Sequence, residues 1–381
     1  MKNCPWLLIL ASVAIGPHAS QTPCSPPMWK VDLIAQYKFR WFGVLANVKG
    51  HHQGAWSWQQ GLAFVSREML AVYQVEENPD VPEVGSRDAS GGTGRYFLQI
   101  LFLAANDGKQ LGAMYLTTPG TGSSRLYPTH DGRFLIRTGE LLRLYSADFQ
   151  KLAEQSLPHS LTATSQGSDV AVSPSGRTVY IDYTASYPTQ PLVRGHALLD
   201  ADSLETIANP TPADLALWPG GPAIRFFPNA MSPIGLPGWF TLLGEWQTVD
   251  LWLKDPFCYS GFHRITPEVY GVAACNRLRL FAPNGHLLWD VPYTDNVASL
   301  RGGQDFIAVE SYHIPADHFD LGLPATPLGI KVYNWKKKSE VCMIQASLER
   351  PHEHWPSIFH DVSPRDAVAV IEGSELSFYR P

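Results

Sequence analysis

The 381-residue sequence lacks a strong charge of either sign, and it lacks a long apolar run. Charged residues make up 17% of the chain, the formal net charge is -6, and three lysines at residues 336–338 form the one basic cluster. Proteins that bind nucleic acids present a basic patch or stripe, so this composition excludes a nucleic-acid partner. The apolar stretch at residues 7–15 is too short for a transmembrane helix, which needs about 20 apolar residues.

Motifs of catalysis and cofactor binding are also missing. The sequence has no Gly-x-Ser-x-Gly motif, and no glycine-rich phosphate loop between a strand and a helix. His352 and His354 flank Glu353, but a metal site needs three or four converging ligands, and the sequence identifies no third one. We therefore assign no catalytic residue, no metal ligand and no cofactor, and we expect a protein without enzymatic activity.

The first twenty residues have the organisation of an export signal. Lys2 supplies a positive start, residues 7–15 supply the apolar stretch, and Ala19 and Ser20 offer small residues for cleavage. We predict that residues 1–20 are a signal peptide. The mature protein is then soluble and exported, either periplasmic or extracellular.

Glycine and proline, by contrast, are frequent at 31 residues each, and they mark a repeated pattern. Residues 168–183 are typical of a strand, a tight turn and a second strand, because Val179 and Ile181 alternate with polar neighbours after a Ser-Pro-Ser-Gly turn. Similar stretches occur at six further places: residues 61–67, 127–134, 217–221, 264–268, 300–304 and 359–365.

A second hairpin follows the first in these units, with turns such as Asn-Asp-Gly at 106–108 and Pro-Asn-Gly at 283–285. Each unit therefore has four strands, a to d, in an antiparallel meander. Seven such units of about 50 residues predict an all-β fold, a single seven-bladed β-propeller whose blades occupy residues 61–381. Two stacked β-sandwiches, or an eight-bladed ring with a further strand pair in residues 40–60, remain as alternatives.

The best-preserved unit resembles a known family. Val-Ser-Pro-Ser-Gly-Arg-Thr-Val-Tyr at residues 172–180, followed by Leu-Leu-Asp-Ala-Asp at 198–202, is similar to the YVTN and WD-like repeats of exported bacterial propellers. The similarity is close in units two, three and seven and loose in units four and six. The resemblance implies a fold and no particular activity, because propellers serve as enzymes and as binding modules alike.

The two ends of the chain are expected to share one blade. The last unit has only three strands, and residues 31–39, within an N-terminal segment at residues 21–60, alternate partly enough to supply the missing outer strand. Pairing the ends would close the ring and remove exposed sheet edges.

Four cysteines remain after signal removal, and their spacing does not match paired zinc ligands. An oxidising compartment allows up to two disulfides. Cys258 and Cys275 are expected at the same end of neighbouring strands, so we predict a bond between them. Cys24 and Cys342 are left for a second bond, which geometry constrains less.

The long insertions between strands b and c indicate a functional face. They lie at residues 76–94, 185–194, 228–237 and 313–328, and these b–c loops are expected on the face opposite the tight a–b turns. Binding residues usually lie on loops carried by a rigid scaffold. The candidate binding residues are His313, Asp317, His318, Phe319 and Trp239.

The sequence thus favours a monomeric binding or scaffold module for a protein or another macromolecule. The alternative is a propeller enzyme of the lactonase or quinoprotein-dehydrogenase kind, with a metal or cofactor on the axis. Such an axial site needs polar residues near the axis, whereas the predicted inner strands contain mainly Ala, Val, Leu and Phe.

Overall fold

A computed structural model of the chain describes the following residues: 22–39, 61–77, 96–118, 124–138, 141–157, 169–172, 176–187, 190–208, 223–225, 238–243, 248–253, 259–266, 269–274, 277–282, 286–293, 296–313, 326–346 and 358–381. Within these ranges the secondary structure is almost entirely β-strand, with one short helix, α1 (Leu33–Tyr37), and one 3-10 turn at His130–Gly132. None of the described helices is long and apolar enough to cross a membrane.

The described strands form seven sheets, which we call blades 1 to 7 in chain order. Blade 1 contains β2 (Gly61–Phe64), β3 (Met69–Glu77), β4 (Tyr96–Ala104) and β5 (Gln110–Thr118). Blade 2 contains β6 (Arg125–Pro128), β7 (Phe134–Thr138), β8 (Leu141–Tyr145) and β9 (Lys151–Ser156). Blade 3 contains β10 (Asp169–Val172), β11 (Thr178–Tyr187), β12 (Gln190–Asp200) and β13 (Thr206–Ala208). Blade 4 contains β14 (Ala223–Arg225), β15 (Gly238–Leu243) and β16 (Thr248–Leu253). Blade 5 contains β17 (Tyr259–Thr266), β18 (Val269–Ala274), β19 (Arg277–Phe281) and β20 (Leu287–Pro292). Blade 6 contains β21 (Asn296–Gly302), β22 (Phe306–His313), β23 (Thr326–Asn334) and β24 (Ser339–Gln345). Blade 7 contains β25 (Ile358–Val362), β26 (Val368–Glu372), β27 (Glu375–Tyr379) and β1 (Trp29–Asp32).

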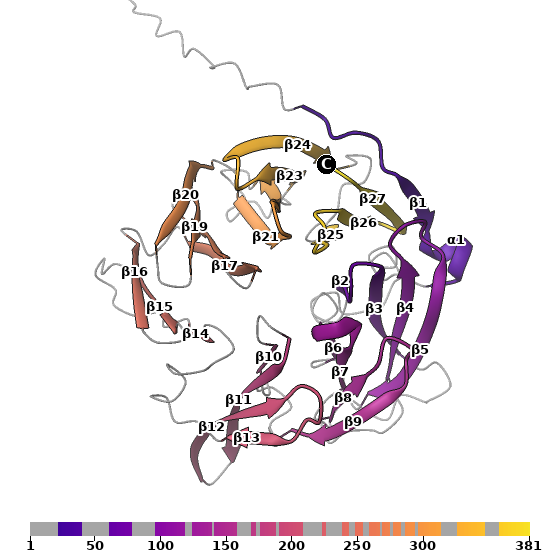
Figure 1. Cartoon of the computed structure of the whole chain (residues 1–381), viewed down its shortest axis with the longest axis vertical. Coiled ribbons are helices and arrows are strands. Elements are labelled where there is room, and N and C mark those ends of the chain that lie inside the picture. Colours follow the sequence, from indigo (N-terminus) through magenta and orange to yellow (C-terminus); the bar gives the residue numbers. More distant parts are fainter. Residues whose placement is uncertain are drawn as a thin grey trace, which may run out of the picture.

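Consecutive strands of each blade pair antiparallel in chain order, and the blades lie around a common centre (Figure 1). The innermost strands of successive blades touch, since β10 contacts β6, β6 contacts β2, β2 contacts β25, β25 contacts β21 and β21 contacts β17. Radially arranged antiparallel meanders of this kind define a β-propeller. The predicted all-β fold of four-stranded antiparallel sheets is confirmed.

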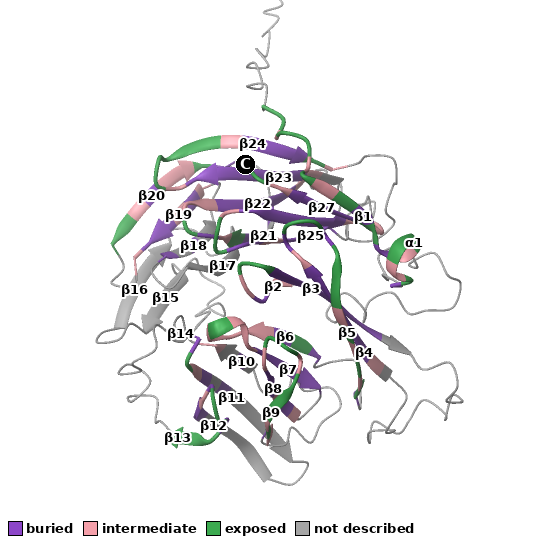
Figure 2. Ribbon diagram, turned by 45° about the vertical axis from the view of Figure 1, so that its right-hand side comes forward, coloured by how far each residue is buried: buried purple, intermediate pink, exposed green. Residues whose placement is uncertain are grey.

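The middle strands of several blades, among them β3 and β22, are buried on both faces because neighbouring blades cover them, as Figure 2 shows in purple. Residues 69–75 of β3 are all buried and, apart from Gln74, apolar or aromatic, so the strand does not alternate between apolar and polar residues. Between blades 1 and 2, Phe102 lies 5.0 Å from Phe134 and 4.6 Å from Phe149 between ring centroids. Outer strands such as β5 and β9 alternate between exposed and half-buried residues, since they lie at the margin.

The a–b and c–d turns gather on one face, which we call the tight-turn face. In blade 2, Gly132 of the first turn has a φ of +73°, and a Cβ added there would lie 3.6 Å from Ala147 of the second turn and 3.7 Å from Ser66 of blade 1. Gly176 of blade 3 has a φ of +71° and lies so close to blade 2 that an added Cβ would meet the backbone nitrogen of His130 at 2.4 Å. The repeated turn glycine therefore serves both turn geometry and close blade packing.

Polar turn residues join neighbouring blades on this face. The Asp366 carboxylate of blade 7 accepts hydrogen bonds from the backbone N–H groups of Asp305 and Phe306 of blade 6, at 2.8 and 3.1 Å. Arg133 of blade 2 donates to Asp202 of blade 3. These turn side chains of the repeat thus form hydrogen bonds to the neighbouring blade.

Residues 22–39, which we call the strap, run along the outside of blades 6, 7 and 1. Strand β1 pairs antiparallel with β27 from Trp29↔Phe378 to Asp32↔Glu375. The strand predicted at residues 31–39 is therefore wrong beyond Asp32, where α1 begins. The reason is that β27 starts at Glu375 and offers no further partner, while the Asp32 carboxylate accepts hydrogen bonds from the N–H groups of the first helical turn.

The strap is also bonded covalently to blade 6. Cys24 and Cys342 form a disulfide with a Cα–Cα distance of 4.7 Å, and the Cys24 N–H donates to the Met343 carbonyl at 3.0 Å. The second of the two expected disulfides is thereby confirmed. Cys258 and Cys275 lie outside the described residues, and their bond stays a prediction for non-reducing peptide mapping.

Candidate functional site

The predicted binding residues are only partly within the described chain. His313 ends β22 and pairs with Thr326 in blade 6, whereas Trp239 lies in β15 of blade 4. The two lie in different blades rather than beside each other. Asp317, His318 and Phe319 fall outside the described residues, as do the predicted signal peptide at residues 1–20 and the predicted insertion at 228–237.

The b–c strands of blade 3 form a long two-stranded ribbon. The described part of the inner strand pairs as far as Asp169↔Asp182, whereas β11 and β12 pair on to Tyr187↔Gln190. The predicted insertion at residues 185–194 is therefore not an irregular loop, because its described residues extend the b–c hairpin. In blade 1, β3 and β4 likewise continue past the inner strand to Glu77↔Tyr96.

A buried polar cluster, Ser299, Glu310 and His360, lies between blades 6 and 7. The Ser299 hydroxyl donates to Glu310 Oε2 at 2.9 Å and lies 3.3 Å from His360 Nδ1. His360 Nε2 lies 3.2 Å from the carbonyl oxygen of Ala308. Glu310 and His360 are both buried, so their polar atoms form hydrogen bonds with protein groups rather than with bulk water.

The hydrogen bonds of this cluster fix its protonation chemistry. A carbonyl oxygen only accepts, so His360 Nε2 carries a hydrogen and Nδ1 of the neutral ring is an acceptor. Burial raises the pKa of Glu310 to about 7, against smaller opposing effects of the Ser299 hydrogen bond and the Arg301 charge. A protonated Glu310 can donate to Ser299 while Ser299 donates to His360. The hydroxyl thus links the Glu310 carboxyl group to the imidazole ring of His360.

Charged side chains of the inner strands of blades 2, 6 and 7, and a tyrosine of blade 1, influence one another electrostatically. Asp361 of β25 accepts a hydrogen bond from the Phe64 N–H of β2 at 2.8 Å, which joins blades 7 and 1. Burial raises the pKa of Asp361, and the nearby Arg301 of β21 opposes that rise. Burial likewise raises the pKa of Tyr73 to about 12, while the charges of Arg125 and Arg301 act in the opposite direction.

The expectation of inner strands made of Ala, Val, Leu and Phe is therefore wrong for part of the ring. Tyr73 reaches across the inner strand because its register partner is Gly61, over which its ring lies. The signal that sequence reasoning missed is the alternation of Ser299 and Arg301 in one predicted inner strand and the adjacent pair His360 and Asp361 in another. Within the described ranges, no group of three or more His, Cys, Asp or Glu side chains could hold a metal ion.

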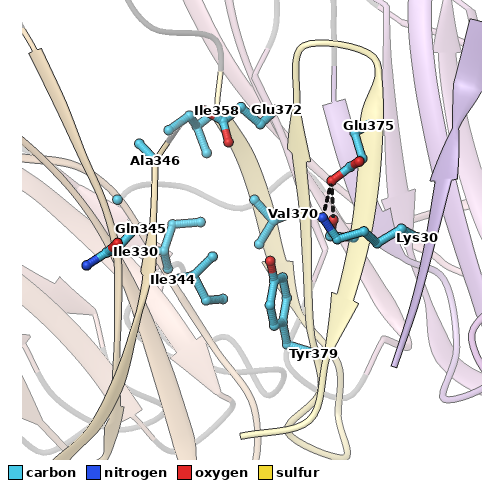
Figure 3. A pocket seen from close by; sticks show the side chains of 12 residues that line it. Lys30, Ile330, Ile344, Gln345, Ala346, Ile358, Val370, Glu372, Glu375 and Tyr379 are labelled. Atoms are coloured by element: carbon cyan, nitrogen blue, oxygen red, sulfur yellow. Dashed lines mark hydrogen bonds and ion pairs between the residues drawn. The ribbon is translucent and has the colours of Figure 1, made fainter. Parts of the chain in front are cut away.

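An open groove of about 410 Å³ lies between the outer parts of blades 6 and 7 (Figure 3). Ile330, Ile344 and Val370 contribute its apolar lining, and Lys30 and Glu375 form an ion pair at 2.6 Å on its blade 7 side. The Glu375 hydrogen bond raises the pKa of Lys30. Both side chains of the pair are half exposed, so the ion pair contributes little to stability.

No protein-family model and no curated protein sequence matches the chain. Solved structures with a similar course of the chain include BamB from Moraxella catarrhalis, at 10% identity over 85% of this chain and 96% of that chain with a TM-score of 0.39. The β-propeller domain of the Trilobed protease from Pyrococcus furiosus has 8% identity over 84% and 95%, with a TM-score of 0.48. Hsv2 from Kluyveromyces lactis has 9% identity over 73% and 86%, with a TM-score of 0.40. At such scores these likenesses carry no functional argument, and the fold rests on the chain's own sheet topology.

Proposed function

We propose that the chain is an exported, closed seven-bladed propeller of the YVTN/WD-like type that binds a protein or another macromolecule through its b–c face. The signal peptide would occupy residues 1–20, the strap would lie within residues 21–60, and the blades would occupy residues 61–381. Seven described sheets and the β1–β27 pairing support a ring closed by its two ends. The Cys24–Cys342 disulfide supports export, because such bonds persist in oxidising compartments.

The difference between the two faces carries the proposal. On the tight-turn face the polar side chains hydrogen-bond to the next blade, as Asp366 does to Asp305. On the opposite face the ribbon of β11 and β12 extends past its inner strand to Tyr187↔Gln190, with no third strand paired to its end among the described residues. A rigid scaffold that presents projecting elements on one face is suited to binding. His313, Asp317, His318, Phe319 and Trp239 remain our candidate contacts there.

Shortening one b–c connection tests this function. His313 and Thr326 are register partners, so an Asn-Gly turn can replace residues 314–325 and close the hairpin. We expect the shortened protein to keep its circular dichroism spectrum and to lose a partner that the intact protein captures by crosslinking in its export compartment. The matched control, Arg365→Ala on the tight-turn face, should retain the partner. Equal capture by all three proteins would contradict a b–c binding face.

The charges at the inner strands favour one second candidate, an enzyme with an axial site. Arg125, Arg301, Asp361 and Tyr73 come from blades 2, 6, 7 and 1, and together they supply the polar groups that such a site requires. Metal analysis and an absorption spectrum of the purified protein distinguish the candidates. A stoichiometric metal or a visible chromophore would favour the enzyme over the binding module.

A further inference from the structure

The outer strands of the blades differ in how their free edges are protected. A free edge presents unpaired backbone N–H and C=O groups, and proteins protect it with charges, proline, short strands or a cover. The strap covers blades 6 and 7, because Pro23 bridges Met343 of β24 and β1 pairs with β27. Three other outer strands carry charged residues or proline: Lys151 and Glu154 in β9, Asp250 in β16, and Asp290 and Pro292 in β20. Strand β13 is only three residues long.

Strand β5 has neither charge nor proline nor small length, and no strand pairs with its outer edge in the part of the chain that the structure describes. Its nine residues, Gln110–Thr118, contain no charged side chain and no proline. It is the last strand of blade 1 in the part of the chain that is described, and it lies at the outer margin of the molecule (Figure 1). It is thus a long, uncharged edge, in a protein that covers two of its other edges with its own backbone.

One face of β5 packs against the core, and the other face is exposed. Met114 and Leu116 pack against the aromatic core between blades 1 and 2. The alternate residues Leu111 and Tyr115 point outward and are 50% and 64% exposed. The Tyr115 hydroxyl accepts a hydrogen bond from Gln99 Nε2 at 2.9 Å, which orients the ring while leaving it largely uncovered. Large apolar side chains at this exposure are typical of a contact surface.

We propose that β5 pairs antiparallel with β5 of a second copy of this chain, with the two-fold axis at Ala113. In this register Leu111 of each copy lies opposite Tyr115 of the other, so that the pairing forms two aliphatic–aromatic cross-strand pairs. The two blade 1 sheets become one continuous sheet. This arrangement departs from the monomer expected from the sequence, and it does not depend on what the b–c face binds.

The spacing of the side chains favours a second copy over an unrelated strand. An isologous interface must be complementary to itself, and an uncharged strand brings no like charges together in an antiparallel pair. Lys109 at the start of β5 would lie opposite Thr117 of the other copy, and its amino group is already 2.8 Å from the carboxylate of Asp107. The central residue, Ala113, is exposed and small enough for two backbones to approach.

Sedimentation velocity over about 1 to 100 μM protein tests the pairing. We expect the wild-type protein to form a concentration-dependent dimer, and Ala113→Lys to raise its dissociation constant at least about tenfold, because two lysines would meet on the axis. Leu152→Lys is the matched control, since Leu152 is 47% exposed on the outer strand of blade 2. It should leave the dimer intact. A wild-type protein that stays monomeric, or a dimer unaffected by Ala113→Lys, overturns the proposal.

A cysteine crosslink tests the register separately. Directly opposed residues in an antiparallel pair have Cα atoms about 4.5–5.5 Å apart, within the range that a disulfide bridges. Under mild oxidation we expect Ala113→Cys to give a covalent dimer on non-reducing gels, and Leu152→Cys to give none. If the Ala113→Cys variant sediments as a dimer but does not crosslink, the register centred on Ala113 is wrong.

Discussion

The interface between blades 1 and 2 and the interface between blades 6 and 7 have the same geometry but different contents. The first is filled by aromatic rings, with Phe134 fully buried against Phe102 and stacked on Tyr145. The second holds a cluster of aliphatic side chains, among them Ile330, Val332 and Val370, and it also contains the buried Glu310 and His360, which are linked through a serine hydroxyl. Propeller geometry therefore requires that the space between blades be filled, and it tolerates polar groups there when they are hydrogen-bonded.

The two interfaces should be stabilised by different means. Burial of aromatic area is worth a similar amount at any pH, whereas a buried carboxyl group stabilises the fold only while it stays protonated. Outside the polar interface the structure adds the strap, with the Cys24–Cys342 disulfide and the β1–β27 pairing. The strap therefore links blades 6 and 7 outside the polar cluster, by a disulfide to blade 6 and by strand pairing to blade 7.

Loss of an aromatic ring between blades 1 and 2 should have the largest effect. Phe134→Ala removes a fully buried ring that contacts three others, so we expect a loss of about 4 kcal/mol in the free energy of unfolding. Denaturant titrations at pH 5 and pH 8 should give the same loss, because no titrating group is involved. Phe134→Leu should cost clearly less. A loss below about 1 kcal/mol would mean that the cavity closes by rearrangement.

Removal of the disulfide should come second. The double variant Cys24→Ser with Cys342→Ser opens a cross-link between residues 318 positions apart, and we expect a loss of about 3 kcal/mol. Thermal unfolding of the oxidised protein measures it, and serine at both positions avoids an unpaired thiol. An unchanged melting temperature would show that the β1–β27 pairing holds the strap without the bond.

Neutralising Glu310 should change how stability depends on pH. The folded-state pKa of about 7 lies above the ordinary value of 4.5, so the unfolded chain releases this proton first. The contribution of this group to the free energy of unfolding is then fully present below about pH 4.5. It decreases as the pH rises through 7, by up to about 3 kcal/mol. The groups that face the carboxyl are Ser299, Arg301 and Tyr312 of blade 6 and His360 of blade 7.

Unfolding of wild type and Glu310→Gln at a series of pH values from 4 to 8 measures this effect. The variant keeps a polar group for Ser299 and cannot ionise, so its stability relative to wild type should improve as the pH rises. Phe134→Ala provides a comparison, because its difference from wild type should not depend on pH. Parallel pH profiles for Glu310→Gln and wild type would show that Glu310 does not titrate in this range.

The smallest effect is expected at the rim of the groove between blades 6 and 7. Lys30→Ala breaks the 2.6 Å ion pair with Glu375, but the two side chains are 50% and 51% exposed. We expect a change of about 0.5 kcal/mol or less, reduced further by salt. A larger loss in thermal unfolding would indicate that Lys30 supports the strap through its packing as well as its charge.

Local patterns in the sequence were enough to predict much of the fold. The Pro-Ser-Gly turn before Arg177, and its counterparts in other units, predicted tight a–b turns, and the structure describes such turns in blades 1, 2, 6 and 7. Turn residues and alternation act over a few positions, so a single sequence reveals them directly. The candidate site was harder to predict, because only His313 and Trp239 of the five predicted binding residues lie in described strands.

The remaining features depend on contacts between distant segments. Strand β1 ends at Asp32 because its partner, β27, begins at Glu375, and nothing near Asp32 in the sequence encodes that limit. Glu310 and His360 meet because blades 6 and 7 pack face to face, and burial there, rather than residue type, raises the pKa of Glu310. The sequence by itself determined the strands, the turns and the meander, since these follow from local backbone preferences. Only the tertiary structure decided which polar side chains are buried together and which sheet edges stay open, because both depend on how the blades pack.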